Sequence, residues 1–118
     1  LIVFDEVDTG VSGRVAQAIA NKMHYISEFA QVLCITHLAQ VASIAGVHIF
    51  IEKMEKDDRT RTTLTTLEED KRIEEIGRML SGEEMTELTK QHAAELIALS
   101  GKIRQQNKVQ KKQVIAND

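Results

Sequence analysis

The chain has 118 residues, of which 42% are hydrophobic and 28% are charged, with a formal net charge of −3. These values are ordinary for a globular domain and exclude a wholly disordered or fibrous protein. Aromatic residues make up only 3% of the chain, which argues against a surface of stacked rings for single-stranded nucleic acid. The single cysteine, Cys34, cannot form an internal disulfide, as is usual in a reducing compartment.

No apolar run approaches the ~20 residues of a membrane-spanning helix, and no signal peptide is recognisable, so we expect no membrane partner. The chain begins at Leu1, inside a predicted strand, which predicts that it is a fragment of a longer protein. Residues 102–118 carry five basic side chains and one acidic side chain, whereas the rest of the chain is acidic. We interpret this basic segment as a solvated tail in preference to a contact with phosphates.

The first elements form a βαβ unit. Leu1–Phe4 is a continuous apolar run, typical of a strand buried on both faces of a parallel sheet. Ser12 is a favourable N-cap for an amphipathic helix that ends at about Glu28. A second apolar run, Val32–Ile35, predicts the next strand. Strand, helix and strand of this length predict two parallel strands whose carboxyl ends share one edge of the sheet.

The elements that follow are a short helix, a hairpin and two longer helices, so the predicted fold class is α/β. The helix at Glu83–Leu99 should turn Leu88, Leu96 and Leu99 inward. The polar stretch after Gly101 should be frayed or disordered. The predicted ranges are a helix at Leu38–Ala45, antiparallel strands at Val47–Met54 and Arg61–Leu67, and a helix from Glu68 to an interruption at Ser81-Gly82.

Polar residues end both strands of the βαβ unit: Asp5-Glu6 follow the first strand and Thr36-His37 the second. Ligands of open parallel sheets bind at this edge. An Asp here can hold Mg²⁺ through its waters, and a neighbouring Glu can orient and deprotonate an attacking water. A His on the adjacent strand end can hydrogen-bond a γ-phosphate. This arrangement predicts a site for phosphoryl transfer.

Three segments resemble one family. Leu1–Gly13, LIVFDEVDTGVSG, resembles the Walker B and D-loop segment of ABC-type ATPase heads in the SMC-like class. Val32–Ala42, VLCITHLAQVA, is similar to the switch-histidine segment, and Arg72–Ile97 resembles the end of the branch that acts in bacterial DNA double-strand-break repair. The resemblance covers roughly residues 1–100. Ala39 departs from it, since a Pro is expected there, which should alter loop stiffness and not chemistry.

The resemblance implies a role for each matched residue. Asp5 would be the Walker B ligand of Mg²⁺, Glu6 the catalytic base for ATP hydrolysis, and His37 the switch histidine. Asp8 would lie in the D-loop, which reaches across a dimer interface toward the partner's nucleotide, and Ser12 and Gly13 would complete that loop. Thr36 should be a strand-end hydrogen-bonding residue and not a catalytic group.

The resemblance also implies a larger assembly. Residues 1–100 would be the C-terminal lobe of a P-loop ABC/SMC-like head, and residues 101–118 a basic tail. Its partners would be a second head in a homodimer, the missing N-terminal half of its own head, and DNA through the full-length protein. We expect a cytoplasmic, nucleoid-associated protein whose ATPase activity is coupled to head engagement in repair and recombination.

Two essential motifs of such heads are absent from this sequence. There is no GxxxxGK[ST] phosphate loop, and Leu80–Glu84 lacks the second glycine of a signature motif and is interpreted as a turn between helices. We therefore expect the fragment alone to bind ATP poorly and not to hydrolyse it.

Alternative functions are a head for chromosome organisation or transport, or a non-catalytic interaction module. Asp8-Thr9-Gly10 also matches the turn of dimeric aspartic proteases, but those folds are nearly all β, whereas a helix follows here. The histidines have no zinc-ligand spacing. We expect His24 and His92 on helix surfaces and His48 on the outward side of a strand.

Overall fold

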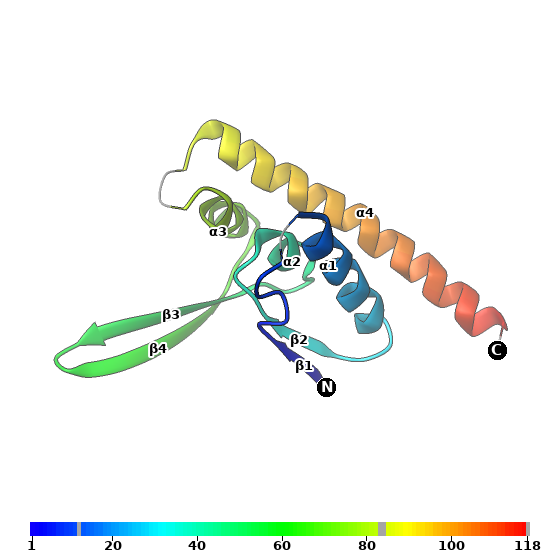
Figure 1. The fold of residues 1–118 in the computed structure, drawn as a ribbon, viewed down its shortest axis with the longest axis horizontal. Coiled ribbons are helices and arrows are strands. Elements are labelled where there is room, and N and C mark those ends of the chain that lie inside the picture. The colour runs from blue at the N-terminus through cyan, green and yellow to red at the C-terminus, as the bar shows by residue number, and fades with distance from the viewer. Residues whose placement is uncertain (12, 83–84, 118) are drawn as a thin grey trace.

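The computed structural model describes residues 1–11, 13–82 and 85–117 of the chain (Figure 1). The α/β class is confirmed, with one parallel strand pair, one antiparallel hairpin and helices. No helix in the described part of the chain combines the length and apolar character needed to cross a bilayer. The elements in chain order are β1 (Ile2–Asp5), α1 (Gly13–Ser27), β2 (Val32–Ile35), α2 (Ala39–Ile44), β3 (Ile49–Lys56), β4 (Arg59–Thr66), α3 (Glu69–Ser81) and α4 (Glu87–Asn117).

The parallel pairing of β1 with β2 is confirmed, in a register that runs from Ile2↔Val32 to Asp5↔Ile35. The predicted burial on both faces is wrong, because Val3 is 53% exposed and Leu33 is 45% exposed. Only the opposite face is covered, where Phe4 and Cys34 pack against the core. In this chain the sheet therefore has one covered face and one apolar face open to solvent.

Helix α2 lies at the centre of the molecule, and two core clusters meet on it. Val41 and Ile44 pack with residues of α1, whereas Ala39 and Ala42 pack with α3 and α4 around the fully buried Ile76. The small side chains of α2 allow three helices to approach it closely. Figure 1 shows this short helix between α1 and α3, with α4 running across them.

Buried backbone carbonyls at the carboxyl end of α2 are bound by an arginine whose role the sequence did not reveal. Nη2 of Arg72, on α3, lies 3.2, 2.8 and 2.6 Å from the carbonyl oxygens of Ala42, Ser43 and Ala45. Nη1 of Arg104, on α4, donates to the same Ala45 oxygen at 3.1 Å. The last carbonyls of a helix have no partner inside it, so these two guanidinium groups cap α2 from neighbouring helices.

The predicted hairpin is confirmed as β3 and β4, which pair antiparallel to the end at Lys56↔Arg59. Its two turn residues, Asp57 and Asp58, have φ values of 52° and 58°, as a type I′ turn requires. Among the described elements the two strands pack on each other and on no helix. The hairpin projects as a two-stranded arm away from the helices (Figure 1).

The predicted break between the last two helices is also confirmed, since α3 ends at Ser81 and Gly82 follows with a φ of +81°. Glu83, the predicted start of the next helix, lies outside the described residues. Helix α4 begins at Glu87. The Thr86 hydroxyl accepts a hydrogen bond from the Thr89 amide at 3.1 Å, as an N-cap does.

The inward face of α4 differs from the leucine stripe that the sequence predicts. Leu88 is 76% exposed and Leu99 is 49% exposed, although Leu96 does pack against the core. The buried positions are Ala93, Ser100 and Asn107, at intervals of seven residues. Small and polar residues lie inward because α4 passes close to α2, where the Ser100 hydroxyl donates to that of Ser43 at 3.2 Å.

Helix α4 continues to Asn117, which differs from the frayed tail predicted after Gly101. Its second half is held by α1 and the residues after it: Asn107 Nδ2 lies 2.8 Å from Nδ1 of His24, and Lys111 Nζ donates to the Glu28 carbonyl. His24 is therefore half-buried and not on the surface, and burial lowers its pKa.

The position of His48 also differs from the outward one that the sequence predicts. It is half-buried just before β3, and its Nδ1 is buried with no hydrogen-bond partner among the described residues. Burial, followed by the nearby charge of Arg72, lowers its pKa. The ring therefore belongs to the packed junction between the arm and α3.

Candidate functional site

The carboxyl ends of β1 and β2 meet at one edge of the sheet, as the sequence predicts. Asp5 is paired with Ile35, the last residue of β2. The Glu6 amide then donates to the Ile35 carbonyl at 3.1 Å, so pairing continues one residue past β1. Thr36 and His37 follow directly. The side chains of Asp5, Glu6 and His37 are all exposed at this edge, where they can reach a ligand from solvent.

The loop after β1 is compact and contains a strained backbone. Glu6 has a φ of 53°, a left-handed conformation that costs a non-glycine residue roughly 1–2 kcal/mol. The Glu6 carbonyl accepts hydrogen bonds from the Thr9 amide at 3.2 Å and the Thr9 hydroxyl at 2.8 Å. The Val11 amide donates to the Asp8 carbonyl at 3.2 Å. These bonds maintain the turn that brings the Glu6 carboxylate to the sheet edge.

Asp8 lies inside this loop, and its side chain is fully buried. Its Oδ2 accepts a hydrogen bond from the Thr36 hydroxyl, which in turn accepts one from the Leu38 amide at 3.0 Å. The other carboxylate oxygen, Oδ1, has no partner among the described residues. The prediction that Thr36 is a strand-end hydrogen-bonding residue is confirmed. The Asp8 carboxylate itself points inward, so only other atoms of its loop face solvent.

The Cys34 thiol lies next to this pair on the covered face of β2. Burial raises its pKa, and the negative charge of Asp8 raises it further. A thiol with a raised pKa is a poor nucleophile. Cys34 therefore contributes packing to the core, where it contacts the cluster of α1 and α2.

Comparison with known proteins gives the family of the chain. DNA repair protein RecN of Bacillus subtilis is 55% identical over 103 residues, which are 87% of this chain and 18% of that protein. RecN of Deinococcus radiodurans is 45% identical over 97 residues, 82% of this chain and 17% of the relative. RecN of Haemophilus influenzae is 40% identical over 98 residues, 83% and 18% of the two chains. The chain belongs to the RecN family. No protein-family model matches it.

The chain spans about 18% of the length of the RecN relatives that it matches. The resemblance to the double-strand-break-repair branch of SMC-like heads, drawn from the motifs around residues 5 and 37, is confirmed at the level of the RecN family. The activity and the partners of the whole RecN protein concern a much longer chain, and for this segment they are proposals.

Two further predicted site residues, Ser12 and Gly13, follow Val11 in the sequence. Gly13 is exposed at the first position of α1 and has a φ of 58°, a conformation that glycine adopts without strain. Ser12 lies outside the described residues. Its predicted roles as N-cap and nucleotide contact therefore stay predictions.

The residues at the edge of the sheet suit a cation that keeps most of its water ligands, and not a metal ion that is held by protein ligands alone. In the described residues of this RecN segment, no three His, Cys, Asp or Glu side chains converge to hold a metal ion. Mg²⁺ needs no such cluster, because it keeps several waters and takes one or two carboxylates together with phosphate oxygens. The exposed carboxylate of Asp5 fits that requirement.

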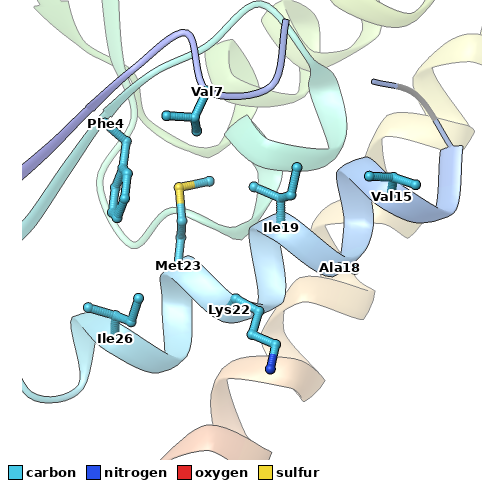
Figure 2. Close-up of a pocket in the computed structure, with 8 residues that line it drawn as sticks. All are labelled: Phe4, Val7, Val15, Ala18, Ile19, Lys22, Met23 and Ile26. Carbon is cyan, nitrogen blue, oxygen red and sulfur yellow. The ribbon is translucent and has the colours of Figure 1, made fainter. Parts of the chain in front are cut away.

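An apolar groove of about 340 Å³ lies beside the site, between α1 and the start of the chain (Figure 2). Among the described residues that line the groove, Lys22 has the one charged side chain and none has a carboxylate. A magnesium-bound triphosphate therefore does not belong in this groove. The lining residues are Phe4, Val7, Val15, Ala18, Ile19, Lys22, Met23 and Ile26.

Proposed function

We propose that this chain is the C-terminal lobe of an ABC/SMC-like ATPase head in a RecN-family DNA repair protein. The observation that supports the proposal most is the convergence of Asp5, Glu6 and His37 at one edge of a parallel strand pair. The relatives are DNA repair proteins. In this proposal the full-length protein hydrolyses ATP and couples hydrolysis to head engagement in DNA double-strand-break repair and recombination.

Each of the three side chains has a chemical task. Asp5 would hold Mg²⁺ through its waters, and the bound cation would neutralise charge on the β- and γ-phosphates. Glu6 would accept a proton from the attacking water, since its carboxylate is exposed at the same edge. His37 would donate a hydrogen bond to the γ-phosphate and so respond to its presence. Gly13, at the start of α1, and Ser12, which precedes it in the sequence, would contact the nucleotide.

The remaining parts of the site would come from other segments. The phosphate loop would be supplied by the N-terminal half of the same head, and the signature motif by a second head in a homodimer. The exposed apolar face of Val3, Leu33 and Ile35 supports a covering partner, since such faces are normally buried. DNA would be bound through the full-length protein, in the cytoplasm at the nucleoid. The isolated chain should not hydrolyse ATP.

The Glu6→Gln variant of the full-length protein tests the proposal. We expect its ATP turnover to fall by roughly 10²–10⁴-fold, because the general base is lost, while ATP binding is retained. The matched control is Glu55→Gln, an exposed carboxylate on the hairpin arm, which should leave turnover unchanged. Steady-state hydrolysis and equilibrium nucleotide binding measure the two properties. Equal turnover by wild type and Glu6→Gln would contradict the proposed role of this site.

A further inference from the structure

Asp8 is the only fully buried charged residue in the described part of the chain. The two ion pairs found among the described residues both lie on α3, so no cation pairs with this carboxylate. A buried carboxylate is strongly unfavourable unless charges or hydrogen bonds compensate it. One hydroxyl, that of Thr36, bonds to Asp8, and Oδ1 has no partner among the residues that the structure describes. A hydrophobic side chain would pack at this place without that cost, so packing alone does not account for Asp8.

The places of Asp8 and Thr36 in the chain indicate the role of the hydrogen bond between them. Asp8 lies two residues after Glu6, and Thr36 lies immediately before His37. The Thr36 hydroxyl donates to Asp8 and accepts from the Leu38 amide at 3.0 Å. One hydroxyl thus connects the loop that carries Glu6 to the segment that carries His37.

We propose that Asp8 and Thr36 are positioning residues that hold the Glu6 carboxylate and the His37 imidazole in register at the sheet edge. We call the hydrogen bond between Thr36 Oγ1 and Asp8 Oδ2 the Asp8–Thr36 latch. The proposal rests on the proposed ATPase function of this edge. In this proposal the latch acts only through its two neighbours, Glu6 and His37.

A fixed position matters here because general-base catalysis requires hydrogen-bond reach to the proton that is removed. A displacement of about 1 Å can cost roughly 10²-fold in rate. The left-handed backbone of Glu6, with its φ of 53°, is strained and persists only where surrounding contacts hold it. Within the loop Thr9 supplies local bonds, and the latch adds the connection to β2.

The test uses the full-length protein with Thr36→Val, which keeps the shape and removes the hydroxyl, and Thr36→Ser, which keeps the hydroxyl. We expect Thr36→Val to lower kcat by roughly 10–100-fold with little change in the KM for ATP. Thr36→Ser should stay within about twofold of wild type, because a hydroxyl can still donate to Asp8. The control is Thr62→Val on the exposed arm, which should leave both constants unchanged.

Substitutions at Asp8 separate the hydrogen bond from the charge. Asp8→Asn keeps an acceptor oxygen for Thr36 and loses the charge, whereas Asp8→Ala loses both. We expect Asp8→Asn to stay close to wild type and Asp8→Ala to fall with Thr36→Val. The double variant Asp8→Ala/Thr36→Val should be no slower than the slower single variant, because both remove one interaction.

Hydrogen exchange gives a readout that does not depend on ATP hydrolysis. Thr36→Val removes the acceptor of the Leu38 amide, so this amide and those of residues 6–11 should exchange faster than in wild type. Wild-type kcat in Thr36→Val, or Thr36→Ser as slow as Thr36→Val, overturns the latch. If Glu6→Gln leaves turnover unchanged, the ATPase proposal fails separately. In that case unchanged exchange at Leu38 and residues 6–11 in Thr36→Val overturns the latch on its own.

Discussion

The capping of α2 by Arg72 predicts a large loss of stability when the guanidinium is removed. In Arg72→Met the methylene stem keeps its packing, but the Ser43 carbonyl loses its donor at 2.8 Å. The Ala45 carbonyl keeps Arg104 at 3.1 Å, and the Ala42 carbonyl keeps a weak bond from the Ala45 amide at 3.4 Å. The substitution therefore leaves one carbonyl unpaired and two with weaker partners.

The size of the loss follows from the kind of bond. A hydrogen bond to a charged group contributes about 1.5–3 kcal/mol, and one Nη2 with two hydrogens cannot make three full bonds at once. Arg72 is half-buried, which keeps the effect in the lower part of this range. We expect Arg72→Met to lower the free energy of unfolding by about 2 kcal/mol. Arg72→Lys should lose about 1 kcal/mol, because the shorter side chain reaches fewer of the three carbonyls that Nη2 contacts.

Equilibrium unfolding in urea measures this loss, with an unchanged m value showing that the transition is comparable. The matched control is Arg78→Met on the same helix, whose guanidinium is exposed and pairs with Glu75. Only the arginine end of this pair is exposed, since the Glu75 side chain is 13% exposed, and we expect Arg78→Met to cost about 1 kcal/mol. If Arg72→Met unfolds within about 0.5 kcal/mol of wild type, or no more easily than Arg78→Met, the capping argument is wrong.

Three other substitutions test the packing, the turn and the pH dependence. Ile76→Ala on α3 should cost about 2–5 kcal/mol in urea unfolding. Leu88→Ala on α4, at a position 76% exposed, should cost less than about 0.5 kcal/mol. Equal costs for the two substitutions would contradict the exposed position of Leu88. Asp58→Gly should raise the unfolding free energy by roughly 0.5 kcal/mol, because its φ of 58° suits glycine; a lower melting temperature would refute this. Burial lowers the pKa of His24 in the folded state, so the unfolded chain binds the proton more readily, and stability should fall as the pH drops below about 6.5. His24→Gln should flatten that fall in urea titrations at several pH values, and the exposed His92→Gln should not; identical slopes in both variants would contradict the assignment.

The elements and the sheet edge were predictable because they depend on local patterns. Two apolar runs joined by a helix of this length lead to parallel strands, and the register Asp5↔Ile35 places their ends together. The pair of aspartates in the two-residue turn and the glycine after Ser81 mark boundaries within a few positions of the chain. Such signals need no knowledge of distant contacts, so they agree with the structure.

The predictions that failed all depended on which partner covers a residue. Val3 and Leu33 are apolar enough for a two-sided sheet, but this chain supplies cover on one face only. Leu88 lies on an exposed face of α4. The basic segment after Gly101 stays helical because Asn107 contacts His24 of α1 and Lys111 donates to the Glu28 carbonyl. Periodicity shows which residues can be buried, and the neighbouring helix decides which are.

Patterns that are local in the sequence were thus enough to predict that Asp5, Glu6 and His37 lie at one edge, since strand direction and loop length depend on residues close together in the chain. Only the folded molecule decided that Asp8 points inward to Thr36, that Arg72 caps α2, and that serines meet where α2 and α4 cross. The physical reason is the same in each case. A buried polar group must find a hydrogen-bond partner, and that partner comes from a segment 28, 29 or 57 positions away in the chain.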